Sequence, residues 1–140
     1  MTRLDGSINK IITRIKTQLP ERANQVAIEL RNSELKINSG PRSGRTYRRY
    51  GRVHTASAPG EPPAVDTGAF RNSWQPLVVS NGSSIFISKI KSTKRVGGMN
   101  HGDMLEHGTP GGKIAPRPYA DKTMEMTKEK ALRIYKRKYF

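Results

Sequence analysis

The sequence predicts an α+β protein in which a long N-terminal helix and a C-terminal helix pack on a small antiparallel sheet, with an extended Pro-rich arm. Two stretches, 8–35 and 120–135, carry apolar residues at helical spacing, and residues 77–90 have the pattern of a β-hairpin. The chain has 140 residues, the size of one domain, so we expect residues 1–140 to form a single domain.

The first half of the N-terminal helix is amphipathic. Ser7 is the expected N-cap, because its hydroxyl can accept from a free N–H of the first turn. Pro20 lacks a backbone N–H, so we expect either one long helix kinked there or two helices with Pro20 opening the second. Helical spacing resumes after Glu21 and continues to about Leu35. The apolar stripe of the first half consists of Ile8, Ile11, Ile12, Ile15 and Leu19.

A basic segment at 42–53 has five arginines, two tyrosines and no acidic residue. Arginines interleaved with aromatic residues are a signal for contact with nucleic acid, and a solvated flexible loop is the simpler alternative. The β-forming residues of this segment also allow a hairpin against which Tyr47 and Tyr50 pack. The arginines are Arg42, Arg45, Arg48, Arg49 and Arg52.

An arm rich in proline follows the basic segment. Its prolines remove backbone donors and force the preceding residues into extended geometry, so this stretch is neither helix nor central strand. We therefore expect residues 41–65 to form an extended basic and Pro-rich arm or loop. Asp66 or Thr67 is expected to start a short turn of helix, and Trp74, the single tryptophan, is the expected core anchor. The prolines concerned are Pro59, Pro62 and Pro63.

The second half of the chain reads as a hairpin followed by a helix. Strands flank an Asn-Gly turn at 80–83, and Ile85, Ile87 and Lys89 share one side of the second strand. Residues 91–102 are expected to be a basic, Gly-rich loop, and 103–109 a short apolar element. Pro118 suits the first turn of the last helix. The expected buried stripe of that helix is Ala120, Met124, Thr127, Ala131, Ile134 and Tyr135.

The net charge of +15, from 26 basic and 11 acidic residues, predicts an acidic partner such as nucleic acid, an anionic membrane or an acidic protein face. The excess lies mainly at the two ends of the chain. No apolar run approaches roughly 18 residues, so we expect no membrane span, and the N-terminus lacks the apolar region of a signal peptide. We expect synthesis in the cytoplasm.

No residue pattern indicates catalysis, a cofactor or a metal. His101, Asp103, Glu106 and His107 lie close in sequence, but their spacing matches no standard metal site. Residues 108–113 resemble a phosphate loop but have three residues between the outer glycines and no Ser or Thr after the lysine. Arg117 lies between two prolines, so we expect its guanidinium to pair with Glu106; an unpaired surface arginine in a rigid turn is the alternative.

Three blocks in order resemble the tail-component family of tailed bacteriophages, the neck or tail completion proteins of the head–tail junction. They are Asp-Thr-Gly-Ala-Phe-Arg-Asn-Ser at 66–73, Leu-Glu-His-Gly-Thr at 105–109, and Ala-Pro-Arg-Pro-Tyr at 115–119, and a terminal helix follows. A leading amphipathic helix is also typical of that family. The chain departs from the pattern at His107, where the family usually has an aromatic residue, and in its arginine-rich segment.

The resemblance implies a structural virion protein with no enzymatic activity. It would act in the neck as a subunit of a homo-oligomeric ring, taken here as a hexamer, between connector or head-closure proteins and tail-terminator or tail-tube proteins. DNA contact through 42–52 is the alternative function. The residues expected at interfaces are Arg42, Arg45, Arg48, Arg49, Arg52, Pro59, Pro62, Pro63, Asp66 and Arg71.

Overall fold

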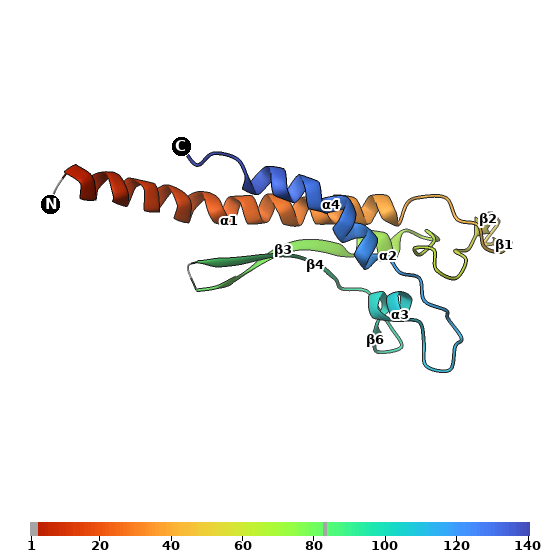
Figure 1. Cartoon of the computed structure of the whole chain (residues 1–140). Helices are drawn as coiled ribbons and strands as arrows, with labels where there is room; N and C mark the ends of the chain where they lie inside the picture. The colour runs from red at the N-terminus through yellow and green to blue at the C-terminus, as the bar shows by residue number, and fades with distance from the viewer. Residues whose placement is uncertain (1–2, 83) are drawn as a thin grey trace.

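The computed structural model describes residues 3–82 and 84–140 and confirms the α+β class. Figure 1 shows α1 (Arg3–Ile37) running the length of the molecule, with α4 (Ala120–Tyr135) beside its second half. The hairpin of β3 (Trp74–Asn81) and β4 (Ile85–Ser92) lies along another side of α1. Ser83, part of the predicted turn, lies outside the described residues.

α1 is one continuous helix, so the predicted alternative of two helices is wrong. Pro20 lies inside it, where a proline removes one hydrogen bond without ending the helix, because the turns that follow are held by packing against α4 and the hairpin. Ser7 is not the N-cap. The helix already includes Arg3, and the Ser7 hydroxyl donates to the Arg3 carbonyl at 3.2 Å.

The core lies where the second half of α1 meets α4 and the hairpin. Ala23 and Ala27 are completely buried, and their small side chains let the backbones approach closely. The hydroxyl of Ser88 on β4 donates to the Ala23 carbonyl at 2.6 Å, which joins strand and helix. The buried apolar residues are Ala23, Val26, Ala27, Leu30, Tyr119 and Ile134.

β3 and β4 pair antiparallel in a register that aligns Val79 with Ile87 and Asn81 with Ile85. Side chains alternate between the faces of such a ribbon. The residues of β4 that are less exposed, among them Phe86 and Ser88, share the face that carries the Ser88 bond to α1. Ile85, Ile87 and Lys89 lie together on the other, exposed face, as the alternation predicts.

Two further hairpins and two short helices complete the chain. β1 (Thr46–Arg49) and β2 (Arg52–Thr55) are joined by Tyr50 and Gly51, which both have positive φ, as a tight two-residue turn requires. The stretch predicted as a loop at 91–102 contains a small hairpin of β5 (Arg95–Val96) and β6 (Met99–Asn100). The short helices are α2 (Ala69–Asn72) and α3 (His101–His107).

The buried face of α4 differs from the predicted stripe. Thr127 and Ile134 are buried as predicted, and Thr123 is buried as well, whereas Ala120 is exposed and Met124 is 61% exposed. The hydroxyls of Thr123 and Thr127 each donate to a carbonyl one turn earlier at 2.8 Å, which permits their burial. The predicted stripe overlooked Thr123, because an apolar pattern treats threonine as polar.

Candidate interaction surfaces

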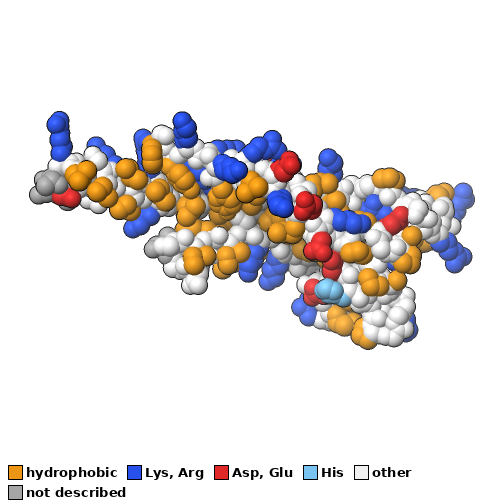
Figure 2. Space-filling model, viewed as in Figure 1, with side chains coloured by type: hydrophobic (Ala, Val, Ile, Leu, Met, Phe, Trp, Pro, Cys, Tyr) orange, Lys and Arg blue, Asp and Glu red, His pale blue; other side chains and the backbone are white. Residues whose placement is uncertain are grey.

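The first half of α1 extends past α4 and the body of the hairpin (Figure 1). The apolar residues of the first half therefore face solvent, whereas those of the second half face the core. We call this row the α1 stripe; it consists of Leu4, Ile8, Ile11, Ile12 and Ile15, which are 36–69% exposed. Figure 2 shows apolar side chains following one another along this part of the helix. A contiguous apolar row in solvent marks a contact surface.

The outer face of the β3–β4 hairpin is also apolar and open. Val79, Ile85 and Ile87 are exposed there, and register places Val79 directly opposite Ile87. No described element covers this face, since α1 packs against the other one. The molecule thus has two different exposed apolar surfaces.

The β1–β2 hairpin projects from the opposite end of the molecule (Figure 1) and carries the basic segment. The side chains of Arg45, Arg48 and Arg52 are exposed and form no ion pair with any described residue. Arg49 forms an ion pair with Asp66 at 2.8 Å, and both side chains are well exposed, so the pair stabilises the fold little. Tyr47 packs edge-on against His54, with ring centroids 5.2 Å apart, whereas Tyr50 is in solvent at the turn.

The Pro-rich part of the predicted arm lies against its own chain. Arg42 donates to the Pro63 carbonyl at 3.0 Å and to the Ile37 carbonyl at 2.7 Å. The carboxylate of Glu61 accepts from the Ser43 hydroxyl at 2.5 Å and from the Ala58 N–H at 2.8 Å, and hydrogen bonds of this kind lower its pKa to about 2. Pro63 is buried, while Pro59 is exposed and Pro62 half-buried.

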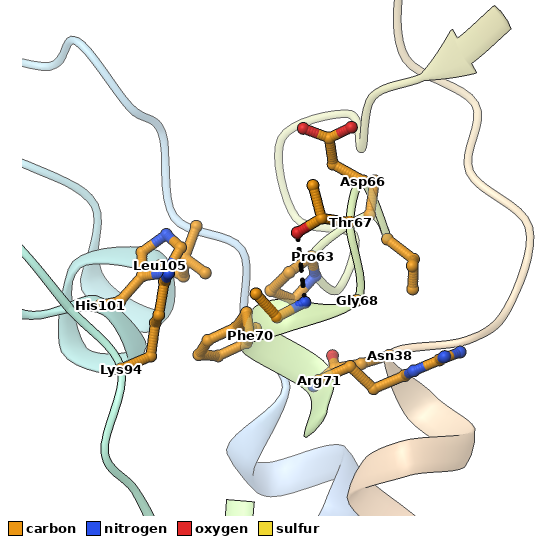
Figure 3. Close-up of a pocket in the computed structure, with 13 residues that line it drawn as sticks. Asn38, Pro63, Asp66, Thr67, Gly68, Phe70, Arg71, Lys94, His101 and Leu105 are labelled. Carbon is orange, nitrogen blue, oxygen red and sulfur yellow. Dashed lines mark hydrogen bonds between the residues drawn. The ribbon is translucent and has the colours of Figure 1, made fainter. Parts of the chain in front are cut away.

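The Asp-Thr-Gly block lines a small pocket between α2, α3 and the end of α1 (Figure 3). Gly68, with φ of 81°, is the N-cap residue of α2. The hydroxyl of Thr67 accepts from the Ala69 N–H at 3.3 Å, a free N–H of the first turn, as the sequence predicted. Arg71 donates to the Ser39 hydroxyl at 3.0 Å. The volume of about 200 Å³ is below that of most small-molecule sites.

Trp74 joins the short elements through an aromatic cluster. Its ring meets those of Phe70 and Tyr119 edge-on, with centroids 5.7 and 5.6 Å apart, and Phe70 meets His101 in the same way at 5.1 Å. Such contacts each stabilise by roughly 1 kcal/mol beyond burial. Gly102 is required here because a Cβ would lie 2.7 Å from the Tyr119 hydroxyl oxygen. Burial lowers the pKa of His101.

The predicted ion pair of Glu106 with Arg117 is wrong: the described part of the chain has two salt bridges, Arg49–Asp66 and Lys130–Glu29. Glu106 instead accepts from the backbone N–H groups of Tyr119 and Ala120 at 2.8 and 3.1 Å. It therefore caps the start of α4, where a helix dipole favours a negative charge. The Arg117 N–H donates to the Leu105 carbonyl at 2.6 Å, so the 105–109 and 115–119 blocks do meet through these bonds.

Sequence reasoning missed the role of Arg22. This side chain is buried and donates to the carbonyls of Tyr135, Arg137 and Lys138 at 2.6–3.1 Å, with its guanidinium 3.7 Å from the Tyr139 ring centroid. It thereby holds the C-terminal tail against the middle of α1. The one signal available was its position within the buried stripe, one residue before Ala23.

Glu34 was also missed. It is completely buried next to Asn38, which donates to one carboxylate oxygen, while the other oxygen has no partner among the described residues. Burial raises the pKa of Glu34 from 4.5 to about 7. A carboxyl group of this kind changes charge near neutral pH. Its spacing on α1, four residues after Leu30, was the signal that placed it on the buried face.

Among the described residues, no three His, Asp or Glu side chains are grouped so that they could hold a metal ion. No helix in the described ranges has the length and apolar character needed to cross a bilayer. Comparisons of the chain with protein-family models, with curated proteins and with solved structures find no match.

Proposed function

We propose that this protein is a structural subunit of the neck of a tailed bacteriophage, where it forms a homo-oligomeric ring that joins the tail to the connector. The observation that carries the proposal is the pair of exposed apolar surfaces, the α1 stripe and the outer face of β3–β4. A closed ring needs two different surfaces on each subunit, because each copy presents one to the copy before it and the other to the copy after it.

The three sequence blocks support the same proposal. The blocks at 105–109 and 115–119 are linked by the Glu106 cap and the Arg117 N–H, and the block at 66–73 contributes Phe70 to the aromatic cluster that includes Tyr119. Their residues thus act together as a structural unit. The partners would be connector or head-closure proteins on one side and tail-terminator or tail-tube proteins on the other, with the protein made in the host cytoplasm and located in the virion.

The mass of the protein in solution tests this function. Native mass spectrometry of the purified protein, alone and mixed with candidate neck proteins, should give a ring or a stoichiometric complex. Particles assembled without the protein should accumulate as separate heads and tails. A protein that stays monomeric with every neck partner, and whose absence leaves heads and tails joined, contradicts the proposal.

We further propose that the β1–β2 hairpin contacts an adjacent subunit or a neighbouring ring, since it is the part of residues 41–65 that projects from the body. The Gly44 N–H donates to the Ala56 carbonyl at 2.9 Å, and the Ala56 N–H donates to the Arg45 carbonyl at 3.0 Å. Two glycines can therefore replace residues 46–55 without disturbing the body. Loss of head–tail joining with a normal melting temperature supports the contact, and unchanged joining refutes it.

Nucleic-acid binding is the second candidate, favoured by the exposed Arg45, Arg48 and Arg52. Replacing all three with Gln should reduce the salt dependence of duplex binding by about three in the log–log slope, because each phosphate contact contributes roughly −0.9. The matched control replaces Lys10, Arg14 and Lys16, which removes the same charge elsewhere. Equal slopes for the two variants would exclude a specific role for the hairpin.

A further inference from the structure

A third open surface lies between α4 and the β3–β4 hairpin, and we call it the α4 groove. Two cavities of about 670 and 620 Å³ share Leu30, Ser88, Asp121 and Met124, so they form one continuous groove along α4. Its apolar lining includes Leu30 and Phe86, and Met124, Leu132 and Ile87 reach solvent at its edges. A groove with exposed apolar edges has the form that an amphipathic helix fills.

Carboxylates outnumber lysines around the α4 groove. Asp103, Glu106, Asp121 and Glu125 line it, against Lys89 and Lys128. The whole chain carries +15, so an acidic excess is the opposite of its general character. Figure 2 shows acidic side chains gathered in this middle part of the molecule, away from the protruding end of α1. The groove therefore favours a basic occupant.

The first half of α1 is an amphipathic helix of the opposite charge. Residues 3–19 carry Arg3, Lys10, Arg14 and Lys16 against Asp5, a net charge of +3. At 3.6 residues per turn, Arg14 and Lys16 lie roughly 100° to either side of the α1 stripe. Their long side chains can extend over the edges of a groove while the stripe enters it.

The two surfaces also match in length. The stripe with its continuation to Leu19 covers residues 4–19, and α4 covers 16 residues, so each is about 24 Å long at 1.5 Å per residue. A molecule cannot fill its own groove in this way, because α1 is continuous through Pro20 and its first half points away from α4 (Figure 1). The groove and its matching helix must therefore meet between two copies.

We propose that the first half of α1 of one copy docks in the α4 groove of a second copy. The contact joins two different surfaces, so it repeats from copy to copy. In a ring built this way the α4 groove receives the α1 stripe, and the outer face of β3–β4 stays open for a further partner; closure into a ring rests on the proposed neck function. Docking covers the α1 stripe together with Met124 and Leu132, which are otherwise exposed.

Disulfide trapping tests the contact directly, since the chain has no cysteine. Ile12→Cys and Met124→Cys variants, purified separately and then mixed under oxidising conditions, should give a mixed dimer. The matched control pairs Ile12→Cys with Val53→Cys, an equally exposed position on the β1–β2 hairpin, and should give none. Equal yields from the two mixtures overturn the proposal.

Charge reversal gives a second test. Asp121→Lys with Glu125→Lys should weaken self-association at least about tenfold in sedimentation equilibrium, and mixing with an Arg14→Glu, Lys16→Glu variant should restore it. All four side chains are exposed, so the monomers should stay folded. The melting temperature of the α4 variant should fall slightly, because Asp121 lies in the first turn of α4, where the helix dipole favours a negative charge. If charge reversal weakens self-association and mixing the two variants does not restore it, the pairing of these two surfaces is overturned.

The outcomes separate this contact from the proposed function. If the protein forms rings but the Ile12→Cys and Met124→Cys variants give no mixed disulfide, the docking contact is overturned and the neck function still stands. A mixed disulfide in a protein whose loss leaves head–tail joining intact supports the contact and contradicts the neck function. Binding of residues 3–19 to anionic phosphatidylserine vesicles without any self-association would show that the stripe serves a membrane, and would overturn the proposal.

Discussion

The two halves of α1 have the same apolar periodicity and opposite surroundings. In the second half, Val26 and Leu30 are buried under α4 and the β3–β4 hairpin, whereas Ile8 and Ile12 in the first half reach solvent. The difference does not come from the pattern, because both halves are amphipathic. It comes from the length of the elements beside them, since α4 and the body of the hairpin lie along the second half (Figure 1). The same helix therefore supplies a core and a contact surface.

The largest expected effect is a difference in the free energy of unfolding between a substitution in the second half of α1 and one in the first half. Leu30→Ala removes a buried side chain and should lower the free energy of unfolding by about 3 kcal/mol. Ile12→Ala should change it by less than about 0.5 kcal/mol at concentrations where the protein is monomeric. Urea denaturation of both variants measures this, and similar losses would contradict the comparison.

The buried half should also respond to pH through Glu34. Its pKa of about 7 exceeds the ordinary 4.5, so the folded state binds the proton more tightly and stability falls as pH rises between these values. The difference corresponds to roughly 3 kcal/mol as an upper bound. Glu34→Gln should remove this fall and exceed the wild type in stability at about pH 8. An unchanged pH dependence of urea denaturation would show that Glu34 is not the cause.

Arg22 lies at the boundary between the halves, so its substitution tests what holds the tail there. Arg22→Lys keeps the charge but loses the forked donor geometry, and we expect a loss of about 2 kcal/mol in unfolding free energy and faster hydrogen exchange in 136–139. Arg14→Lys, on the protruding half, is the matched control and should change neither. Equal exchange in the two variants would mean that the tail is held by other contacts.

Pro20 separates the halves, and its replacement should have the smallest effect. Pro20→Ala restores a backbone donor in a continuous helix, a gain partly cancelled because proline stiffens the unfolded chain. We expect about 1 kcal/mol of added stability and greater helicity by circular dichroism. A loss of stability would indicate that the proline is needed for the path of α1.

Local patterns were enough to predict most of the elements. Helical spacing predicted α1 and α4, and the Asn-Gly turn between β-forming residues predicted the hairpin of β3 and β4 with Ile85 and Ile87 on one face. The single tryptophan was expected to be an anchor, and Trp74 lies in the aromatic cluster. These features depend on residues near one another in sequence, whose preferences are visible in the chain itself.

By itself, the sequence determined the α+β class, the amphipathic faces and the excess of positive charge. The spacing of apolar residues, the residues of a turn and the composition can all be read from the chain without knowing how it folds. Only the tertiary structure decided which half of α1 is buried, that Glu106 caps α4 instead of pairing with Arg117, and that Arg22 holds the tail. Each of these depends on where distant backbone groups come to lie. An exposed carbonyl or N–H can be satisfied by any nearby donor or acceptor, and only the packed chain specifies which one is near.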